Sequence, residues 1–305
     1  MTLVVGVDAG GTVSRAVVAT TDGVIVGRGE AGPGNPLAAG ANSAVAAAVH
    51  EALRGHSPRS VVAATLGIAG PATAALFTPA LTALGITARV DVIGDVVTAL
   101  AAGTPTTSGT VLVAGTGAIA ASIRDGVVAG TADGLGWLLG DEGSGRWLGL
   151  QAVRAAVRDW DSPFAARVAA RTGARTANEM VYWAQALPLS EIGALAPLVC
   201  EAARSADPHA TAIVDQAVTH LVRTLDELGP AEPIVLAGGL LAGDTPVRDG
   251  VLATLRTRGL HPRTSLDPAA GAAWLAARPS SPLSPAALHE ALLGDRRIRG
   301  GDPGA

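Results

Sequence analysis

The chain has 305 residues, a length typical of about two domains, and 49% of them are hydrophobic, which is enough for sizeable cores. All 22 basic residues are arginine and the net charge is -4, so we expect no basic surface for nucleic acid. The single cysteine, Cys200, excludes an internal disulfide and a multi-cysteine metal site within one chain. Apolar stretches are short and interrupted, so we expect neither a membrane span nor a signal peptide, and hence a cytoplasmic protein.

The first third of the chain predicts three adjoining strands followed by alternating helices and strands. Apolar, β-branched runs separated by glycine turns predict strands at 3–7, 14–20 and 24–28. A Pro/Gly loop then precedes a helix that Asn42 and Ser43 would cap. The remaining elements expected here are a strand at 61–68, a helix at 73–84, a strand at 89–93 and a helix at 96–101. This order implies a mixed sheet covered by helices.

A polar break at 104–109 is the expected domain boundary, and beyond it the opening pattern recurs. A strand, a Gly/Thr turn, a second strand, an Asp-Gly turn and a third strand are expected at 110–114, 115–117, 118–123, 125–126 and 127–130. Two duplicated halves, each with a Gly/Thr turn after its first strand, would face one another across a cleft.

The rest of the chain predicts a helical region, a short strand and further helices. Helical patterns cover 148–159, 165–171, 176–186, 192–205 and 208–228, followed by a strand at 233–237 and helices at 247–258 and 267–277. We therefore expect an N-terminal domain over 1–107, completed by a returning helix at 267–278, and a C-terminal domain over 108–266. The Pro/Ser-rich remainder, 279–305, would be a peripheral tail with a short helix at 285–293.

Two turns present backbone N–H groups suited to phosphate, because only glycine permits such close approach. Each follows a buried strand, and their residues are Gly10, Gly11 and Thr12 in the first and Gly115, Thr116 and Gly117 in the second. Asp8 would repel a bare phosphate, so its place beside the first turn indicates Mg²⁺ between them, held through water. One turn alone is equally typical of a hairpin; the pair with Asp8 favours nucleotide phosphates. No P-loop or Rossmann fingerprint accompanies them, which excludes both of those classes.

Two polar residues further along are candidates for substrate contact. Asp95 follows a predicted strand, where it would either cap a helix or accept the proton of a substrate hydroxyl. In phosphoryl transfer such a carboxylate mainly orients and polarises the nucleophile. Asn35 lies in a tight Gly-Asn-Pro loop, and its amide would either bind sugar hydroxyls or serve as a turn residue.

The stretch 133–149 combines six glycines, three acids and two of the five tryptophans of the chain. Its glycines allow close approach of the backbone, and Asp141 and Glu142 can accept hydrogen bonds from hydroxyl or ammonium groups. This composition is typical of a sugar pocket; the alternative is a long loop whose tryptophans fill the core.

Together these motifs resemble the N-acetylglucosamine kinase / glucosamine kinase family, within the actin-like ATPase superfamily of sugar kinases. The resemblance spans about residues 3–278 and rests on the segments 8–12, 115–117, 237–239 and 136–149. It implies an α/β, two-domain actin-like ATPase (ribonuclease H-like) fold with the active site in the interdomain cleft. It also implies that Asp95 is the catalytic base and that Gly238 and Gly239 bind adenosine. The residues it assigns to the sugar pocket are Asn35, Asp95, Thr116, Gly136, Trp137, Asp141 and Glu142.

The resemblance implies transfer of the ATP γ-phosphate to the 6-hydroxyl of a hexosamine, with Mg²⁺. A free amine is cationic near neutral pH, so carboxylates at Asp141 and Glu142 favour glucosamine as the substrate. Glu179 would either add to this negative charge or be a solvated helix residue. N-acetylglucosamine is the alternative, since an acetamido group needs a small apolar wall and one amide partner. We expect no nucleic-acid or membrane partner and leave a homodimer open.

Three other classes of protein agree less well with the sequence. Activator ATPases of 2-hydroxyacyl-CoA dehydratases need two cysteines per chain for a shared iron-sulfur cluster, and this chain has one. Related glucokinases and repressors with a Cys-rich zinc motif are excluded by the same count, and we expect no helix-turn-helix before Leu3. A non-catalytic sensor of amino sugar or nucleotide would not need both Asp8 and Asp95.

Overall fold

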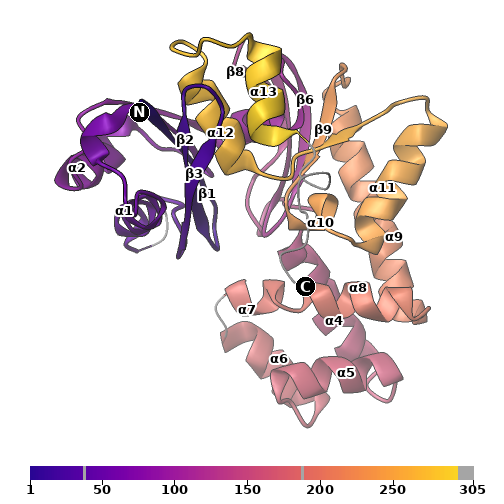
Figure 1. Ribbon diagram of the computed structural model, residues 1–305. Coiled ribbons are helices and arrows are strands. Elements are labelled where there is room, and N and C mark those ends of the chain that lie inside the picture. Colours follow the sequence, from indigo (N-terminus) through magenta and orange to yellow (C-terminus); the bar gives the residue numbers. More distant parts are fainter. Residues whose placement is uncertain (37–38, 187–188, 295–305) are drawn as a thin grey trace, which may run out of the picture. The chain divides into compact units, whose positions relative to one another are not determined.

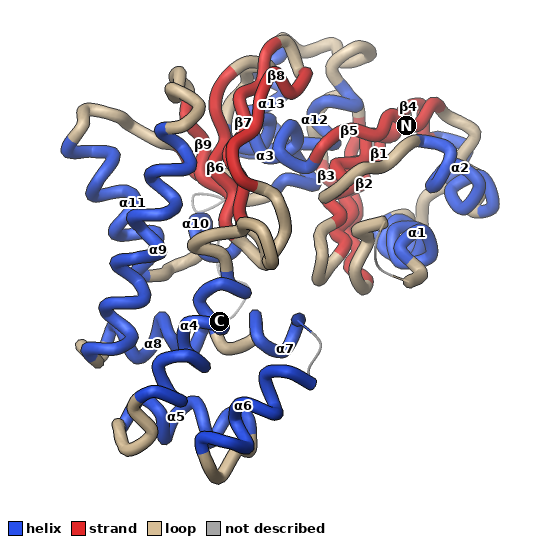
Figure 2. The backbone as a smooth tube through the Cα atoms, turned by 180° about the vertical axis from the view of Figure 1, so that it is seen from behind, coloured by secondary structure: helices blue, strands red, loops and turns tan. Residues whose placement is uncertain are grey.

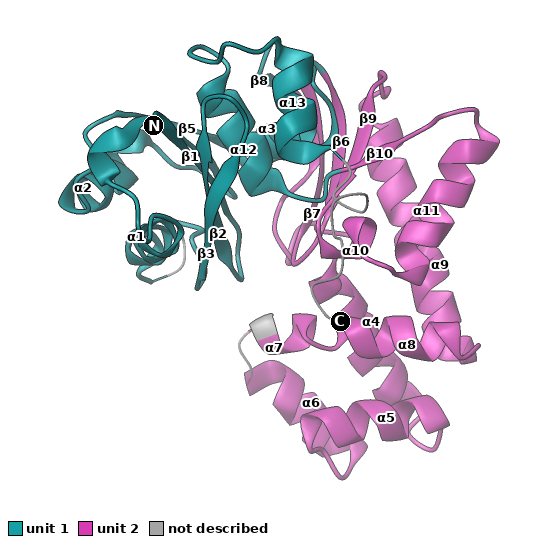
Figure 3. Cartoon of the chain, viewed as in Figure 1, with its two compact units in different colours: residues 1–108, 124–128, 265–305 teal, residues 109–123, 129–264 magenta. Residues whose placement is uncertain are grey.

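The computed structural model describes residues 1–36, 39–186 and 189–294 (Figure 1). The chain divides into two compact units, which are described separately (Figure 3). Unit 1 contains residues 1–108 and 124–128 together with the chain from 265 onward, and unit 2 contains residues 109–123 and 129–264. Over the described part of the chain, no helix is both long enough and apolar enough to cross a membrane.

Unit 1 is built on a five-stranded sheet with the order β3-β2-β1-β4-β5. Its strands are β1 (Leu3–Ala9), β2 (Ser14–Thr20), β3 (Ile25–Ala31), β4 (Val61–Ile68) and β5 (Arg89–Gly94). The hairpin-linked strands β1, β2 and β3 pair antiparallel, whereas β4 runs parallel to both β1 and β5. The predicted mixed sheet is therefore confirmed, and its parallel strands all end at one edge.

Helices cover both faces of this sheet (Figure 1). One face packs on α1 (Ala41–Ala52) and α2 (Ala74–Ala83), and the other on α3 (Asp95–Gly103), α12 (Pro268–Ala277) and α13 (Pro285–Leu293); a short 3₁₀ helix covers Pro58–Ser60. The alternation along β1 explains the two cores. Leu3, Val5 and Val7 are buried with α1 and α2, while Val4 is buried with α12 and α13. The start of α1 differs from the prediction, because Gly40 rather than Asn42 is the N-cap residue.

Gly6 brings α12 directly onto β1, because a methyl group there would overlap backbone atoms of Ala269 and Ala273. We expect Gly6→Ala to lower the free energy of unfolding of unit 1 by about 1–3 kcal/mol, the usual cost of overpacking a core. Urea denaturation followed by circular dichroism measures this loss. Gly32→Ala is the matched control, since a methyl group at Gly32 meets nothing within 4 Å. Equal midpoints for the two variants would contradict the close packing of α12.

The segment after α12 corrects one sequence prediction, that residues 279–305 form a peripheral tail. In α13, Leu288 and Leu292 are 0% and 3% exposed and lie in the same core as Trp274. The Trp274 indole N–H also donates to the Pro285 carbonyl at 2.9 Å. The chain up to Gly294 is therefore an integral part of unit 1, and the remainder of the predicted tail, 295–305, lies outside the described residues.

Unit 2 repeats this plan with a five-stranded sheet of order β10-β9-β6-β7-β8. Its strands are β6 (Gly109–Ala114), β7 (Ala118–Arg124), β8 (Val127–Asp133), β9 (Ile234–Ala237) and β10 (Arg263–Thr264). Strand β6 pairs antiparallel with β7 and parallel with β9, as β1 does with β2 and β4. The duplication predicted from the sequence is thus present as one strand order in both sheets.

The helices of unit 2 pack into one large core with its sheet. They are α4 (Gly145–Arg158), α5 (Pro163–Thr172), α6 (Ala177–Ala186), α7 (Leu189–Gly193), α8 (Ala196–Arg204), α9 (Pro208–Asp226), α10 (Gly239–Ala242) and α11 (Pro246–Thr257). Helices α9 and α11 run beside the strands, and α4 to α8 gather at one end of them (Figure 2). The helix predicted over 192–205 is interrupted, because Pro197 lies in the first turn of a new helix. Strand β10 was not predicted; it is only two residues long.

Candidate functional site

In unit 1, the carboxyl ends of three parallel strands bring the predicted acids together. Ala9 of β1 pairs with Ile68 of β4, which pairs with Gly94 of β5, so the chain leaves all three strands at one edge. Asp8 is the penultimate residue of β1, and Asp95 follows β5 as the first residue of α3. Such an edge is where ligands bind in open α/β sheets.

The charge of Asp95 contributes to the raised pKa of Asp8. Burial and then the charge of Asp95 raise the pKa of Asp8 from 3.8 to about 7. Burial also raises the pKa of Asp95, against the opposing effect of the hydrogen bond from the Val96 N–H. The N-cap residue of α3 is Gly94, so Asp95 is not the helix cap that was the alternative prediction. Two neighbouring acids whose pKa values are both raised are typical of a functional site.

The first glycine turn and the Asn35 loop meet at the same edge of unit 1. The N–H groups of Gly34 and Asn35 both donate to the Gly10 carbonyl, at 3.1 and 3.2 Å. The Asn35 amide lies beside Gly70, in the turn after β4. A methyl group on Gly11 would meet nothing within 4 Å, so the backbone before Thr12 is open to a ligand. The structure therefore places Asp8, Asn35, Asp95 and the first turn in one cluster.

In unit 2, the second glycine turn lies against the predicted adenosine turn. Val113 of β6 pairs with Ala237 of β9 in parallel, so Gly115 and Gly238 follow neighbouring strand ends. A methyl group on Gly238 would overlap the backbone of Ala114 and Gly115, and its φ of 82° also requires glycine. Gly239 then starts the short helix α10 rather than a plain turn.

The loop 133–144 is hydrogen-bonded to this second turn. The Asp141 carboxylate accepts the N–H of Ala118 at 3.2 Å, and the Gly145 N–H donates to the Gly115 carbonyl at 2.8 Å. Ser144 caps α4 by accepting the Trp147 N–H at 3.2 Å, so this helix begins at Gly145, before the predicted start at 148. The backbone N–H of Arg146 donates to the Thr116 carbonyl at 3.4 Å.

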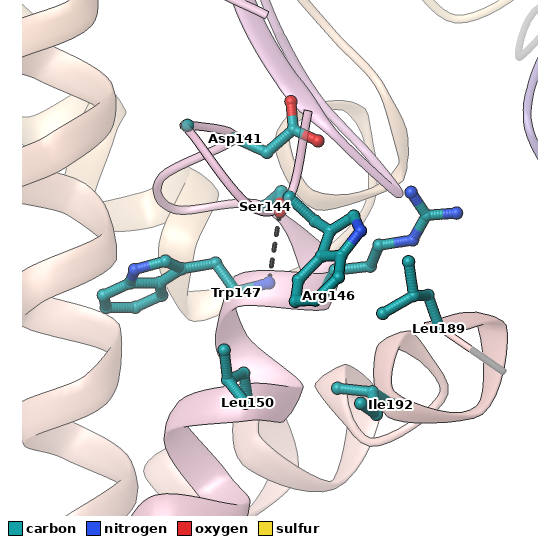
Figure 4. Close-up of a pocket in the computed structure, with 9 residues that line it drawn as sticks. Asp141, Ser144, Arg146, Trp147, Leu150, Leu189 and Ile192 are labelled. Carbon is teal, nitrogen blue, oxygen red and sulfur yellow. Dashed lines mark hydrogen bonds between the residues drawn. The ribbon is translucent and has the colours of Figure 1, made fainter. Parts of the chain in front are cut away.

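A small pocket lies between the loop 133–144 and the helices α4 and α7 (Figure 4). It is lined by Trp137, Gly140, Asp141, Ser144, Arg146, Trp147, Leu150, Leu189 and Ile192. Asp141 lies at one end and Leu150 at the other, while Leu189 and Ile192 form an apolar side. The pocket holds about 30 Å³, room for a small substituent rather than a whole sugar ring. Burial raises the pKa of Asp141, which is only 7% exposed, against the opposing effect of the Ala118 N–H.

Glu142 faces away from this pocket. Its carboxylate contacts two residues of α9: it forms an ion pair with Arg223, and it lies 3.0 Å from Nδ1 of His220. The Trp147 ring packs edge-on against His220, with ring centroids 5.1 Å apart. Glu179 is likewise bound to Arg175, at 3.0 Å on the surface. Of the three carboxylates that favoured glucosamine, only Asp141 lines the pocket.

The sequence reasoning missed two residues of this region, Asp133 and Arg146. Asp133 ends β8, and its carboxylate accepts the N–H groups of Asp141 at 2.7 Å and Glu142 at 3.0 Å. Arg146 lines the pocket, and its buried Nε has no hydrogen-bond partner among the described residues. An Asp-Gly pair at a strand end was the available signal for Asp133; nothing in the sequence indicated the direction of Arg146.

Two sheets of one strand order, each with glycine turns at the carboxyl edge, define the two-domain actin-like ATPase fold that the sequence predicted. A profile of the BadF/BadG/BcrA/BcrD ATPase family matches residues 5–276, and the chain belongs to that family.

Similar proteins agree with the resemblance drawn from the sequence. An N-acetylmuramic acid/N-acetylglucosamine kinase of Clostridium acetobutylicum is 27% identical over 174 residues, which are 53% of this chain and 55% of that protein. The match thus spans about half the length of this curated relative. The structure of a proposed N-acetylglucosamine kinase from Chromobacterium violaceum is 27% identical with a TM-score of 0.74, covering 90% of this chain and 99% of the other. A ROK family glucokinase from Streptomyces griseus, solved with glucose and AMPPNP, shares the fold at 20% identity, with a TM-score of 0.62 and coverage of 90% and 99%.

Proposed function

We propose that this protein is an ATP-dependent sugar kinase that phosphorylates the 6-hydroxyl of a hexosamine. The observation that carries the proposal is the pair Asp8 and Asp95 at one sheet edge, beside a glycine turn built to approach phosphate. The names of the kinases to which the chain is similar support the same class of reaction.

Asp95 is the proposed catalytic base. The sugar O6 attacks the γ-phosphorus of ATP, the bond from that phosphorus to the β,γ-bridging oxygen breaks, and ADP leaves. The proton of the 6-hydroxyl passes to the Asp95 carboxylate. Because burial raises the pKa of Asp95, it accepts this proton more readily than an exposed aspartate would. The glycine turns supply N–H donors to the phosphates, since the chain has no lysine to do so.

Asp8 is the proposed residue on the Mg²⁺ side of the phosphates. Its raised pKa indicates a buried acid beside a second acid, an environment that a divalent cation would relieve. Among the described residues no group of three or more acids, histidines or cysteines could hold a metal. Mg²⁺ commonly binds through one or two carboxylates, waters and substrate phosphates, and Asp8 would be such a carboxylate. The ion would offset phosphate charge.

Within this class we propose glucosamine as the substrate, on the negative charge of Asp141 at the pocket. N-acetylglucosamine is the second candidate. The small space beside Leu150, Leu189 and Ile192 favours it, because an acetyl methyl group would fill such an apolar side.

A coupled ADP-release assay over glucosamine, N-acetylglucosamine and glucose tests the function. We expect release to depend on an amino sugar and on Mg²⁺, and the ratio of kcat/KM values between the two amino sugars decides the substrate. If no sugar stimulates ADP release, the kinase proposal is wrong. Binding of an amino sugar without turnover would instead favour the alternative that the protein is a non-catalytic sensor of amino sugar or nucleotide.

The two neighbouring acids of the loop should behave differently when neutralised. We expect Asp141→Asn to raise KM for the amino sugar about tenfold or more, because Asp141 lines the pocket. Glu142→Gln is the matched variant and should change that KM less than about twofold, since His220 and Arg223 already hold its carboxylate. Steady-state kinetics at saturating ATP measures both. An equal rise in KM for the two variants would contradict the separation of their roles.

A further inference from the structure

A single carboxylate holds together the two ends of the loop after β8. We call this point, formed by Asp133, Asp141 and Glu142, the neck of the loop. Asp133 ends the strand, and its two oxygens accept the N–H groups of Asp141 and Glu142, at 2.7 and 3.0 Å. The residues between, 134–140, form a loop whose first and last residues are glycines. Carboxylate acceptors make stronger hydrogen bonds than neutral oxygens do, so this contact holds the two ends of the loop firmly together.

The backbone at the neck is committed to this arrangement. Asp133 and Asp141 both adopt left-handed conformations, with φ values of 57° and 58°. Gly140 passes so close to Asp133 that a methyl group on it would overlap the carboxylate. Left-handed residues other than glycine are uncommon and are held in place by their surroundings, so the neck stores strain that its hydrogen bonds offset.

The same neck is bonded to the second glycine turn. Ala118, which directly follows Gly115–Gly117, donates its N–H to the Asp141 carboxylate at 3.2 Å and accepts the Gly134 N–H at 3.1 Å. One strand end, one pocket acid and one phosphate turn therefore form a continuous hydrogen-bonded network within unit 2. A shift of Asp141 on ligand binding must move the N–H of Ala118 as well.

We propose that Asp133 is a positioning residue that fixes Asp141 in the pocket and couples amino-sugar binding to the phosphate turn Gly115–Gly117. The inference rests on the proposed kinase function. With the neck closed, sugar bound at Asp141 orders the turn that receives ATP phosphates, and nucleotide binding in turn favours the sugar-binding position of Asp141. Thermodynamic linkage makes the two effects equal in size.

The test measures the Kd of a non-hydrolysable ATP analogue by calorimetry, with and without saturating glucosamine or N-acetylglucosamine. In the unaltered protein we expect the sugar to tighten nucleotide binding about tenfold, within the usual range of such coupling. Asp133→Asn should reduce this factor to less than about twofold and weaken sugar binding about tenfold, because an amide cannot accept both N–H groups. Asparagine tolerates the left-handed conformation, so the substitution removes hydrogen bonding rather than backbone fit.

Asp125→Asn is the matched control. Asp125 lies in the turn before β8 and also has a left-handed φ, of 50°, but it is exposed and lies at the opposite end of β8 from the neck. It should keep the full coupling factor. Should Asp133→Asn not fold, Asp133→Ser replaces it, since a hydroxyl can still accept one N–H.

Amide hydrogen exchange gives a readout that is independent of turnover. Exchange over residues 134–142 should quicken in Asp133→Asn and stay unchanged in Asp125→Asn. An unaltered protein that binds neither amino sugar would overturn the proposed function itself. A protein that binds sugar, but whose coupling and exchange are the same in Asp133→Asn, would overturn the role of Asp133 alone.

Discussion

Replacing Asp95 with asparagine is expected to lower kcat by about 10²–10⁴-fold while the Kd of the sugar changes less than about threefold. The amide keeps the shape of the side chain and can still accept the Val96 N–H, but it cannot take the proton of the sugar hydroxyl. Single-turnover kinetics and calorimetric titration measure the two quantities separately. The raised pKa also predicts that kcat of the unaltered enzyme climbs with pH above the usual aspartate range, as Asp95 ionises.

Asp91→Asn provides the control for this experiment. Asp91 lies on the same strand, β5, and its carboxylate is paired with Arg89 at 2.7 Å on the surface. Its replacement should leave kcat within about twofold. Full activity of Asp95→Asn would remove Asp95 from the base role, whereas a large loss of sugar affinity would make it a binding residue instead.

Asp8→Asn is expected to abolish Mg²⁺-dependent turnover and yet to stabilise the metal-free protein at pH 8. The pKa of Asp8 is about 7 in the folded chain against an ordinary 3.8, so the folded state binds its proton more tightly than the unfolded state. The free energy of unfolding therefore falls as pH rises from about 4 to about 7. Asparagine does not ionise and avoids this loss, a gain on the order of 2–4 kcal/mol at pH 8.

Thermal unfolding in EDTA at pH 5 and pH 8 tests the sign of this effect. The difference in Tm between the two pH values should be smaller in Asp8→Asn than in the unaltered protein. Added Mg²⁺ and ATP should raise Tm in the unaltered protein more than in the variant. Asp22→Asn, in the exposed turn between β2 and β3, is the control and should match the unaltered protein. A variant less stable than the unaltered protein at pH 8 would contradict the assignment.

Local patterns were sufficient to predict every strand except β10. Apolar alternation and glycine turns lie within a few residues of each other, so the strands β1, β2, β6 and β7 and their duplication could be read directly. The helix at 285–293 was predicted, but the burial of Leu288 and Leu292 was not. The surrounding sequence is rich in Pro and Ser, which is typical of a peripheral segment. The shared strand edge of Asp8 and Asp95 followed from topology, since parallel strands end together.

Side-chain direction could not be predicted in the same way. Glu142 is bound by Arg223, which is 81 residues away in the sequence, and no local signal indicates which acid of a neighbouring pair turns toward α9. The neck at Asp133 depends on left-handed backbone at two non-glycine residues, which sequence patterns do not specify. Such features arise only when the chain is packed.

The direct contact of α12 with β1 sets an order for folding during synthesis. Unit 1 is made from the first 108 residues and from the chain after 264, whereas most of unit 2 lies between them. The cover of the β1 face that carries Val4 and Gly6 is incomplete until α12 and α13 have been translated, because only α3 precedes them in the chain. Unit 2 can therefore complete its core first, although its synthesis begins later. Unit 1, which contains Asp8, completes its core last.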